Sequence, residues 1–440
     1  MPAARIAHPV TIQDKEKPNV SYWDSFKLYW SFKPLSYYEN QILSLLPFYP
    51  DPSDKKRAEI INTVIDDKNN YIHEFLVENV EKSDGDLPLD IVLVHGYGAA
   101  LGFFSANFDG LTKFPGTRLH AIDLPGFGLS SRPPFPNLKG DTVDDVIKSE
   151  EFFIDALEKW RIAKGLDQFV LIGHSLGGYL SCCYYMKYGT GIVSKLVLVS
   201  PVGIERSDLS FYVTKEHSLP IDKETELASR EGVDLTNEFT DHQAGRTHAE
   251  ELDHTNDVVS ITSDSSDTDT SSLMTQVRRA PQVGKLFTRL WERNYSPFQI
   301  LRLFGPFAGK LVSGWTFNRF SHLQDPNILF KINEYAAKTM LARGSGEFAL
   351  TRILAPGAVA KLPLSERLPG KIKIKSLWLY GDVDWMSKEG GYEIVKEINE
   401  KNKDDENAKA KFRIVKDAGH HLYMDNASDF EYQVLKFIKD

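Results

Sequence analysis

The sequence has few cysteines, no long apolar run and no excess of basic residues. Only two of its 440 residues are cysteine, Cys182 and Cys183. Because they are adjacent, we expect two buried thiols and no disulfide, and no Cys/His pattern resembles a metal cluster. No apolar run approaches the roughly 18 residues that a membrane-spanning helix needs. The net charge of −9 argues against non-specific nucleic-acid binding, which requires a basic surface. We expect an intracellular protein that is soluble or peripheral to a membrane.

The N-terminal region lacks the apolar core of a secretory signal, and its mixed charges make a poor mitochondrial presequence. Residues 20–50 are instead dense in Trp, Tyr and Phe. Such rings suit a membrane–water interface, although a helical arm packed on the main domain explains them equally well. One face of a predicted helix carries four of the rings, with two lysines beside them: Trp23, Phe26, Trp30 and Phe32, with Lys27 and Lys33.

From residue 71 onward, short apolar runs alternate with helical patterns. Such a series predicts an α/β fold with a mostly parallel, helix-covered sheet. The first run reads as an antiparallel strand. The predicted strands cover residues 71–77, 91–94, 119–123, 169–172, 196–199, 377–380 and 412–415.

The alternation stops between residues 203 and 370, which reads as an insertion. Its part at about 222–275 is polar and acidic, and we predict that it is disordered, as a solvated spacer or a phosphorylation target. Its later part is helical and aromatic, and we predict a lid over the site. The remaining divisions are an aromatic N-terminal arm at 1–70 and a core in two parts, at 71–202 and 371–440.

The pentapeptide G-H-S-L-G at residues 173–177 lies between a predicted buried strand and an apolar helix. A serine at such a turn sits in strained backbone, and Gly173 and Gly177 allow the strand and helix to approach closely. The first N–H groups of the helix point at the space above the hydroxyl. This context favours Ser175 as a nucleophile over a polar residue in a glycine-rich turn.

A serine nucleophile needs a base and a group that orients the base. Both are expected downstream of the serine, at strand ends, with the acid before the histidine. The loop after the strand at 377–380 carries Asp382 and Asp384. We favour Asp384 as the acid and keep Asp382 as the alternative. The loop after the last strand carries His420, which we favour as the base, and His421, which we expect at the solvent or the edge of the core.

An oxyanion hole is expected where the segment LVHGYGAALGFF ends an early strand. A His-Gly pair followed by small residues lets a backbone N–H approach the reacting carbonyl. We predict that the N–H groups of Tyr97 and Leu176 form the hole and that Gly96 and Gly98 shape the loop. We expect His95 to be structural.

Five segments together resemble an α/β-hydrolase: HGYGA, AIDLPGFGLSSRP, GHSLGGY, LYGDVDWM and DAGHHLYMDN. The resemblance spans residues 91–440. More narrowly, the sequence is similar to the subfamily of lysophospholipid lipases, the lipase coactivator comparative gene identification 58, and fungal cardiolipin-specific deacylases and lysophosphatidic acid acyltransferases. The segments YGDVDWM and GSGEFAL and a His-x4-Asp spacing carry this narrower likeness.

The resemblance implies a serine acyl hydrolase of glycerophospholipids that remodels cardiolipin through an acyl-serine intermediate. In the subfamily His-x4-Asp has been read as an acyltransferase signature, and His420 with Asp425 matches it. An acidic residue at this spacing can equally fix the histidine loop. The coactivator branch replaces the nucleophile, whereas this chain keeps Ser175, which makes a non-catalytic lipid-surface scaffold the weaker alternative.

The partners implied are a phospholipid or lysophospholipid substrate and a peripheral membrane contact. No cofactor, metal or nucleic acid is implied; acyl-CoA enters only as the co-substrate of the acyltransferase alternative. If the enzyme does not act on lipid, a hydrolase of small esters or an aminopeptidase is the alternative. The resemblance places the protein at a mitochondrial membrane, with the cytosol or a lipid-droplet surface as alternatives.

Overall fold

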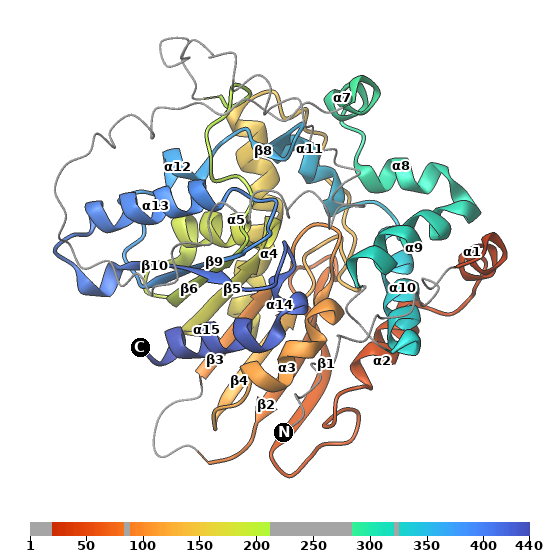
Figure 1. Cartoon of the computed structure of the whole chain (residues 1–440), viewed down its shortest axis with the longest axis horizontal. Helices are drawn as coiled ribbons and strands as arrows, with labels where there is room; N and C mark the ends of the chain where they lie inside the picture. The colour runs from red at the N-terminus through yellow and green to blue at the C-terminus, as the bar shows by residue number, and fades with distance from the viewer. Residues whose placement is uncertain (1–19, 83–88, 212–283, 321–324) are drawn as a thin grey trace, which may run out of the picture.

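The computed structural model describes residues 20–82, 89–211, 284–320 and 325–440. Its centre is an eight-stranded sheet with helices on both faces (Figure 1). The strands are β1 (Lys56–Val64), β2 (Tyr71–Asn79), β3 (Leu89–Val94), β4 (Thr117–Ile122), β5 (Phe169–His174), β6 (Val193–Val199), β9 (Ser376–Gly381) and β10 (Ala410–Val415).

The strand order is β1-β2-β4-β3-β5-β6-β9-β10. The pairs β1–β2 and β2–β4 are antiparallel, and every other pair is parallel. All seven predicted strands are confirmed, including the antiparallel first one. The central strand β5 is buried along its whole length, as expected of an apolar run covered on both faces.

The prediction missed β1, which lies in the range assigned to the N-terminal arm. This edge strand alternates between half-buried and exposed positions and carries Lys56, Arg57 and Glu59. It therefore lacks the continuous apolar run by which the other strands were recognised. The sheet begins at Lys56 rather than after residue 70.

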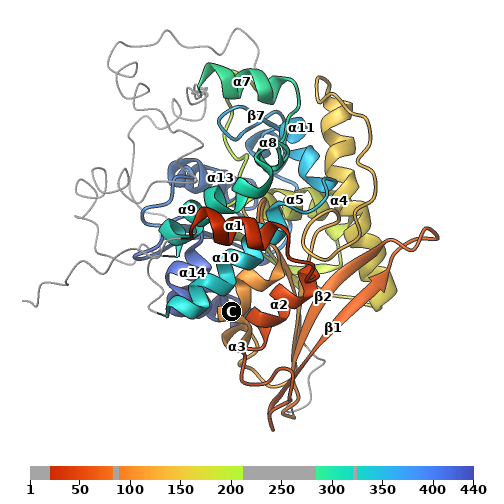
Figure 2. The ribbon, with the colours of Figure 1, turned by 90° about the vertical axis from the view of Figure 1, so that its right-hand side faces the viewer.

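Helices cover the two faces of the sheet (Figures 1 and 2). On one face α3 packs against α15, and on the other α4 packs against α5, while α13 lies on β10. The helix α5 carries Cys182 and Cys183, which are buried and free, as expected. These helices are α3 (Ser105–Leu111), α4 (Val143–Lys164), α5 (Leu176–Tyr184), α13 (Lys388–Lys401), α14 (Leu422–Asp425) and α15 (Ala427–Lys439).

The described part of the insertion is mainly helical and lies beside the N-terminal arm (Figure 2). The predicted acidic spacer at about 222–275 falls outside the described residues. The insertion contains α7 (Lys285–Glu292), α8 (Pro297–Leu303), α9 (Ala308–Arg319), α10 (Pro326–Met340), α11 (Leu350–Ile353), β7 (Leu354–Ala355), β8 (Val359–Ala360) and α12 (Leu364–Arg367). The arm contains α1 (Tyr22–Tyr29) and α2 (Leu35–Leu43).

The two helices of the aromatic arm differ in how deeply they are buried. The helix α2 packs on α10 and buries Tyr38, Ile42 and Leu43. The helix α1 packs on α9 yet leaves Trp23 62% exposed. Phe32, expected on the same helical face, lies beyond the end of α1 and is 99% exposed.

A buried ionic cluster joins the first strands of the sheet. The Nδ1 of His120 lies 2.6 Å from Glu74 Oε1, and its Nε2 lies 3.1 Å from Asp90 Oδ1. Burial disfavours the charged imidazole, but the hydrogen bonds to Asp90 and Glu74 outweigh it and raise the pKa of His120. The pKa values of both carboxyls are lowered, because these hydrogen bonds overcome the effect of burial. His120 is therefore held as a cation between two carboxylates.

We expect His120→Gln to lower the free energy of unfolding by about 3 kcal/mol near pH 6, because it leaves two buried carboxylates short of a cation. Because the pKa of His120 is higher in the folded state, its charge stabilises the fold fully below the unfolded-state pKa of about 6.5. This contribution is lost as the pH rises through the folded-state pKa. The difference in free energy of unfolding between wild type and variant should therefore be smaller at about pH 9 than at pH 6. Urea unfolding at both pH values measures this difference, and an equal difference at both would show that His120 is neutral.

Candidate active site

The carboxyl ends of four parallel strands bring three predicted site residues and Ser200 to one edge of the sheet. Ser175 directly follows β5, and Ser200 directly follows β6. Asp384 lies in the loop after β9, and His420 lies in the loop after β10. This edge is where open α/β sheets bind ligands.

Ser175 occupies a sharp turn between β5 and α5, with φ 52° and ψ −118°. Its neighbouring glycines are sterically required. A Cβ on Gly177 would lie 2.4 Å from the carbonyl oxygen of His95, and a Cβ on Gly173 would lie 2.5 Å from the carbonyl oxygen of Gly177. The close approach predicted from the pentapeptide is thus present, and it exposes part of the Ser175 hydroxyl at the apex of the turn.

Ser175, His420 and Asp384 form one hydrogen-bonded chain. The Nε2 of His420 lies 3.0 Å from Ser175 Oγ, and its Nδ1 lies 3.2 Å from Asp384 Oδ1. Burial would raise the pKa of Asp384, but the charge and hydrogen bond of His420 and the hydroxyl of Ser200 lower it. An ionised Asp384 accepts the Nδ1–H bond, which leaves Nε2 free to accept the serine proton.

Asp382, the alternative acid, has a different position. Its carboxylate accepts hydrogen bonds from the backbone N–H groups of Asp417 at 2.9 Å and Ala418 at 2.8 Å. It therefore ties the end of β9 to the loop that carries His420. Of the two carboxylates, Asp384 is the one that the structure brings to the imidazole.

The predicted oxyanion loop passes directly against the serine turn. A Cβ on Gly96 would lie 2.9 Å from the Cβ of Ser175, so only glycine fits there. Leu176 is the first residue of α5, and its N–H therefore has no acceptor within the helix. The ring of Tyr97 stacks on Phe298 of the lid helix α8, with 4.7 Å between ring centroids. The loop of Gly96 and Tyr97 therefore passes beside Ser175, and the Tyr97 and Leu176 N–H groups stay the predicted oxyanion donors.

His95 has a structural place, as expected. Its Nδ1–H donates to the carbonyl oxygen of Gly96 at 2.8 Å, and its Nε2 accepts the N–H of Leu124 at 3.0 Å. Burial lowers the pKa of His95, so the ring is neutral. It fixes the start of the oxyanion loop.

His421 is 9% exposed, so of the two expected positions the solvent is wrong and the edge of the core is consistent with the structure. Its Nδ1 accepts a hydrogen bond at 2.9 Å from the Nε–H of Arg319, at the end of α9. Arg319 also donates to Asp425 at 2.7 Å, and Asp425 accepts the N–H of Gly419 at 2.9 Å. Asp425 therefore fixes the histidine loop, which was one of its two sequence-based readings.

Sequence reasoning missed three residues that hold the site. The hydroxyl of Ser200 donates to Asp384, and the Nε2–H of His174 donates to the carbonyl oxygen of His420 at 3.0 Å. The position of Ser200 at a strand end was an available signal. Arg319 gave no such signal, because it lies in the lid 102 residues before His421.

Within the described residues, one group of side chains could supply three ligands to a metal ion: Glu39, His73 and Asp123. However, His73 Nε2 lies 2.8 Å from Glu39 Oε1, and its Nδ1 lies 2.7 Å from Asn62. Asp123 accepts two backbone N–H groups. These hydrogen bonds use the ligand atoms, so the group joins the arm to the sheet.

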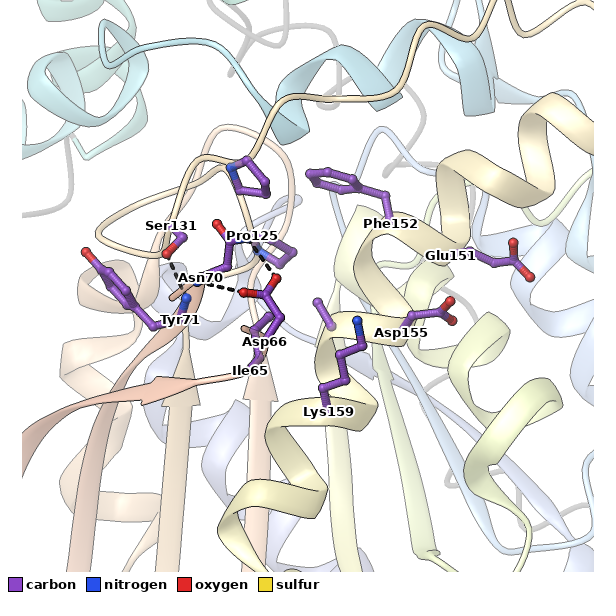
Figure 3. Close-up of a pocket in the computed structure, with 12 residues that line it drawn as sticks. Ile65, Asp66, Asn70, Tyr71, Pro125, Ser131, Glu151, Phe152, Asp155 and Lys159 are labelled. Atoms are coloured by element: carbon purple, nitrogen blue, oxygen red, sulfur yellow. Dashed lines mark hydrogen bonds between the residues drawn. The ribbon is translucent and has the colours of Figure 1, made fainter. Parts of the chain in front are cut away.

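A cavity of about 200 Å³ lies between the β1–β2 turn and α4 (Figure 3). Asp66, at its wall, accepts hydrogen bonds from Asn70. Neither Ser175 nor either of its two partners lines this cavity, which is therefore separate from the candidate active site.

Comparison with known proteins supports the fold. Residues 91–230 match the family model described as alpha/beta hydrolase fold. The 1-acylglycerol-3-phosphate O-acyltransferase of Arabidopsis thaliana is 29% identical over 351 residues, which are 78% of this chain and 65% of that protein. Protein ECM18 of Saccharomyces cerevisiae is 28% identical over 399 residues, 84% of this chain and 75% of that protein.

The 1-acylglycerol-3-phosphate O-acyltransferase ABHD5 of Sus scrofa is 43% identical over 135 residues, 30% of this chain and 35% of that protein. Among solved structures, naproxen esterase from Bacillus subtilis aligns with a TM-score of 0.46 at 14% identity, covering 96% of this chain and 100% of that one. The chain spans just under two thirds of its plant relatives, 66% and 65% of their lengths. The protein has the α/β-hydrolase fold, and its sequence is similar to the relatives named ABHD5 and ECM18.

Asp384→Asn and Asp382→Asn should separate the two carboxylates. We expect Asp384→Asn to lower kcat for a short soluble ester by about 10⁴-fold, because the amide no longer selects the tautomer that accepts the serine proton. Asp382→Asn should change kcat by less than about tenfold and act mainly on stability, since the amide oxygen can accept only one of the two N–H bonds and the carboxylate does not touch the imidazole. Hydrolysis of p-nitrophenyl butyrate, with thermal unfolding of each variant, measures this. Equal losses of kcat would contradict the assignment.

Proposed function

We propose that this chain is a serine acyl hydrolase of glycerophospholipids, with cardiolipin remodelling as its role. The observation that carries the proposal is the hydrogen-bonded chain from Ser175 through His420 to Asp384. The names of the relatives, acyltransferases of 1-acylglycerol-3-phosphate, support a glycerolipid substrate. The cardiolipin headgroup comes from the sequence resemblance.

In the proposed reaction, Ser175 Oγ attacks the ester carbonyl while His420 Nε2 takes its proton. Ionised Asp384 stabilises the imidazolium, and the N–H groups of Tyr97 and Leu176 hold the tetrahedral oxyanion. As the intermediate collapses, His420 protonates the departing lysolipid alkoxide, and the acyl group stays on Ser175. A water molecule, deprotonated by His420, then releases the fatty acid.

Acyl transfer is the second candidate, and the names of the relatives favour it. In this variant acyl-CoA supplies the acyl group, and a lysophosphatidic acid hydroxyl replaces water in the second step. The same three residues serve both reactions. Hence the outcome depends on how far the lid excludes water and where it places the acceptor.

The arm and the lid together form an exposed aromatic surface that suits lipid contact. In α1 Trp23 is 62% exposed, and in the adjoining lid Leu303 is 78% exposed. The hydroxyl of Ser25 in α1 donates to the Pro306 carbonyl oxygen at 2.7 Å, which joins the two segments. The exposed apolar residues of this surface are Tyr22, Trp23, Phe26, Tyr29, Trp30 and Phe32 of the arm and Leu303, Phe304, Phe307 and Leu311 of the lid.

We infer that this surface docks on a membrane, at the mitochondrion by resemblance. Amphipathic rings settle at the lipid interface, and Lys27 and Lys33 beside them are attracted to anionic headgroups. In the parts of the chain that the structure describes, no helix is long and apolar enough to cross a membrane.

The reaction is tested with purified protein on vesicles that contain cardiolipin. We expect the wild type to release fatty acid and Ser175→Ala to release none above background, because the nucleophile is gone. Fatty acid and monolyso-cardiolipin are quantified by mass spectrometry. Unchanged release by Ser175→Ala would end the hydrolase proposal. Transfer from acyl-CoA to lysophosphatidic acid without hydrolysis would favour the second candidate.

The docking surface is tested with Trp23→Ala/Trp30→Ala. We expect vesicle binding to fall at least about tenfold, since one large buried apolar side chain is worth about 1.5–3 kcal/mol. Hydrolysis of a soluble ester should stay unchanged. Tyr432→Ala is the matched control, because Tyr432 is 58% exposed on α15, away from α1 (Figure 1). Equal effects on binding in both variants would contradict the assignment.

A further inference from the structure

The last residue of the lid helix α9 binds the loop that carries the base. Arg319, its last residue, donates from Nε to His421 Nδ1 at 2.9 Å and from Nη2 to Asp425 Oδ2 at 2.7 Å. Its side chain is 12% exposed and that of Asp425 is 7% exposed, so both bonds are largely shielded from water. A guanidinium in such surroundings loses far more by releasing its partners than a surface pair would.

The two acceptors fix the residues on either side of His420: His421 directly, and Gly419 through Asp425. His421 is the next residue after His420, and the rings of the two histidines lie 5.3 Å apart. Asp425 reaches back to the N–H of Gly419, the residue before His420, at 2.9 Å. Arg319 thus holds the segment 419–421 from both ends, through one side chain that the lid supplies.

His421 can take part in this arrangement only as a neutral ring. Burial, followed by the charge of Arg319, holds the pKa of His421 well below its usual value. The charged and titratable groups around it are His174 of β5, His420, Arg319 of α9 and Asp425 of α14. Its Nδ1 therefore offers a lone pair, which is the acceptor that the Nε–H of Arg319 needs.

The opposite end of α9 lies at the docking surface. Lys310 donates to the carbonyl oxygen of Val20 in the arm at 2.8 Å, and Gly309 packs closely on Ser25 of α1. Phe307, just before the helix, is 57% exposed. A helix of 12 residues spans about 18 Å, so one rigid element extends from the aromatic surface to the base.

We propose that Arg319 is a positioning residue that holds His420 in line with Ser175 from the lid, and that Asp425 is its anchor rather than an acyl-transfer group. The proposal rests on the proposed function of Ser175. Because α9 carries Arg319, His420 is aligned only while α9 of the lid is packed in the position that the structure shows. The His-x4-Asp spacing then reflects a tie between lid and loop that serves hydrolysis and transfer alike.

The test uses the full chain with two probes that need no lipid: p-nitrophenyl butyrate and a fluorophosphonate that labels an activated serine. We expect Arg319→Gln to lower kcat about 10–100-fold at nearly unchanged KM and to slow labelling of Ser175 by the same factor. Arg319→Lys should lose less, since an ammonium can still bond Asp425 but cannot hold both acceptors in a fork. In an Asp425→Asn background, Arg319→Gln should cost much less than it does alone.

The matched control is Arg118→Gln. It breaks a bidentate ion pair to Asp90, with both contacts at 2.6 Å, at the amino ends of β3 and β4, the opposite edge of the sheet from the site. It should lower the unfolding temperature and leave the labelling rate unchanged.

Three results would overturn the proposal. Labelling of Arg319→Gln at the rate of Arg118→Gln would make the Arg319 contacts merely structural. An Asp425→Asn protein that hydrolyses the ester at the wild-type rate but no longer transfers acyl groups would make Asp425 an acyl-transfer residue. A wild-type protein that is neither labelled nor able to hydrolyse the ester would remove the proposed function itself. The first two results differ from this one because in both of them the wild type is active.

Discussion

The strained turn at Ser175 is the constraint on which the rest of the site depends. A residue other than glycine at positive φ costs of order 1–3 kcal/mol and persists only where the surroundings enforce it. Here a fully buried strand precedes the turn and a fully buried helix follows it, so neither can move to relieve the strain. The glycines around the turn then set how closely β3, β5 and α5 approach, and this approach brings the oxyanion loop against the serine.

The base is positioned differently, by ties from several directions. Asp382 holds the start of its loop, His174 holds the carbonyl of His420, and Asp425 with Arg319 holds the segment around it. The serine is therefore fixed by local backbone geometry, whereas the histidine is fixed by long-range hydrogen bonds. A loop held in this way can respond to the element that supplies one of its ties, and here that element is the lid.

The arm and the lid act as one layer over the sheet edge. The helix α2 is anchored in the core, while α1 is carried on α9 and keeps its aromatic rings exposed. Burial thus differs between two consecutive helices of the arm. Through α9, the exposed aromatic rings of α1 are connected to the loop that carries His420.

Much of the fold and site could be predicted from sequence, because the signals are local. Buried strands appear as continuous apolar runs, and Ser175, Asp384 and His420 each follow such a run or its short loop. The edge strand β1 was missed because its residues alternate and no run is fully apolar. Asp384 was favoured and Asp382 was kept as the alternative, since both carboxylates follow the same strand, and only the structure shows which of them meets the imidazole.

What the sequence determined by itself was the succession of strands and turns along the chain, and with it Ser175, His420 and the loop that carries two candidate carboxylates, because each depends on residues next to it in the chain. The tertiary structure decided which carboxylate meets the imidazole, that Ser200 supports it, that His421 is buried, and that Arg319 reaches Asp425 across 106 residues. Those contacts depend on how distant segments pack against one another. No pattern of neighbouring residues in the sequence predicts that packing.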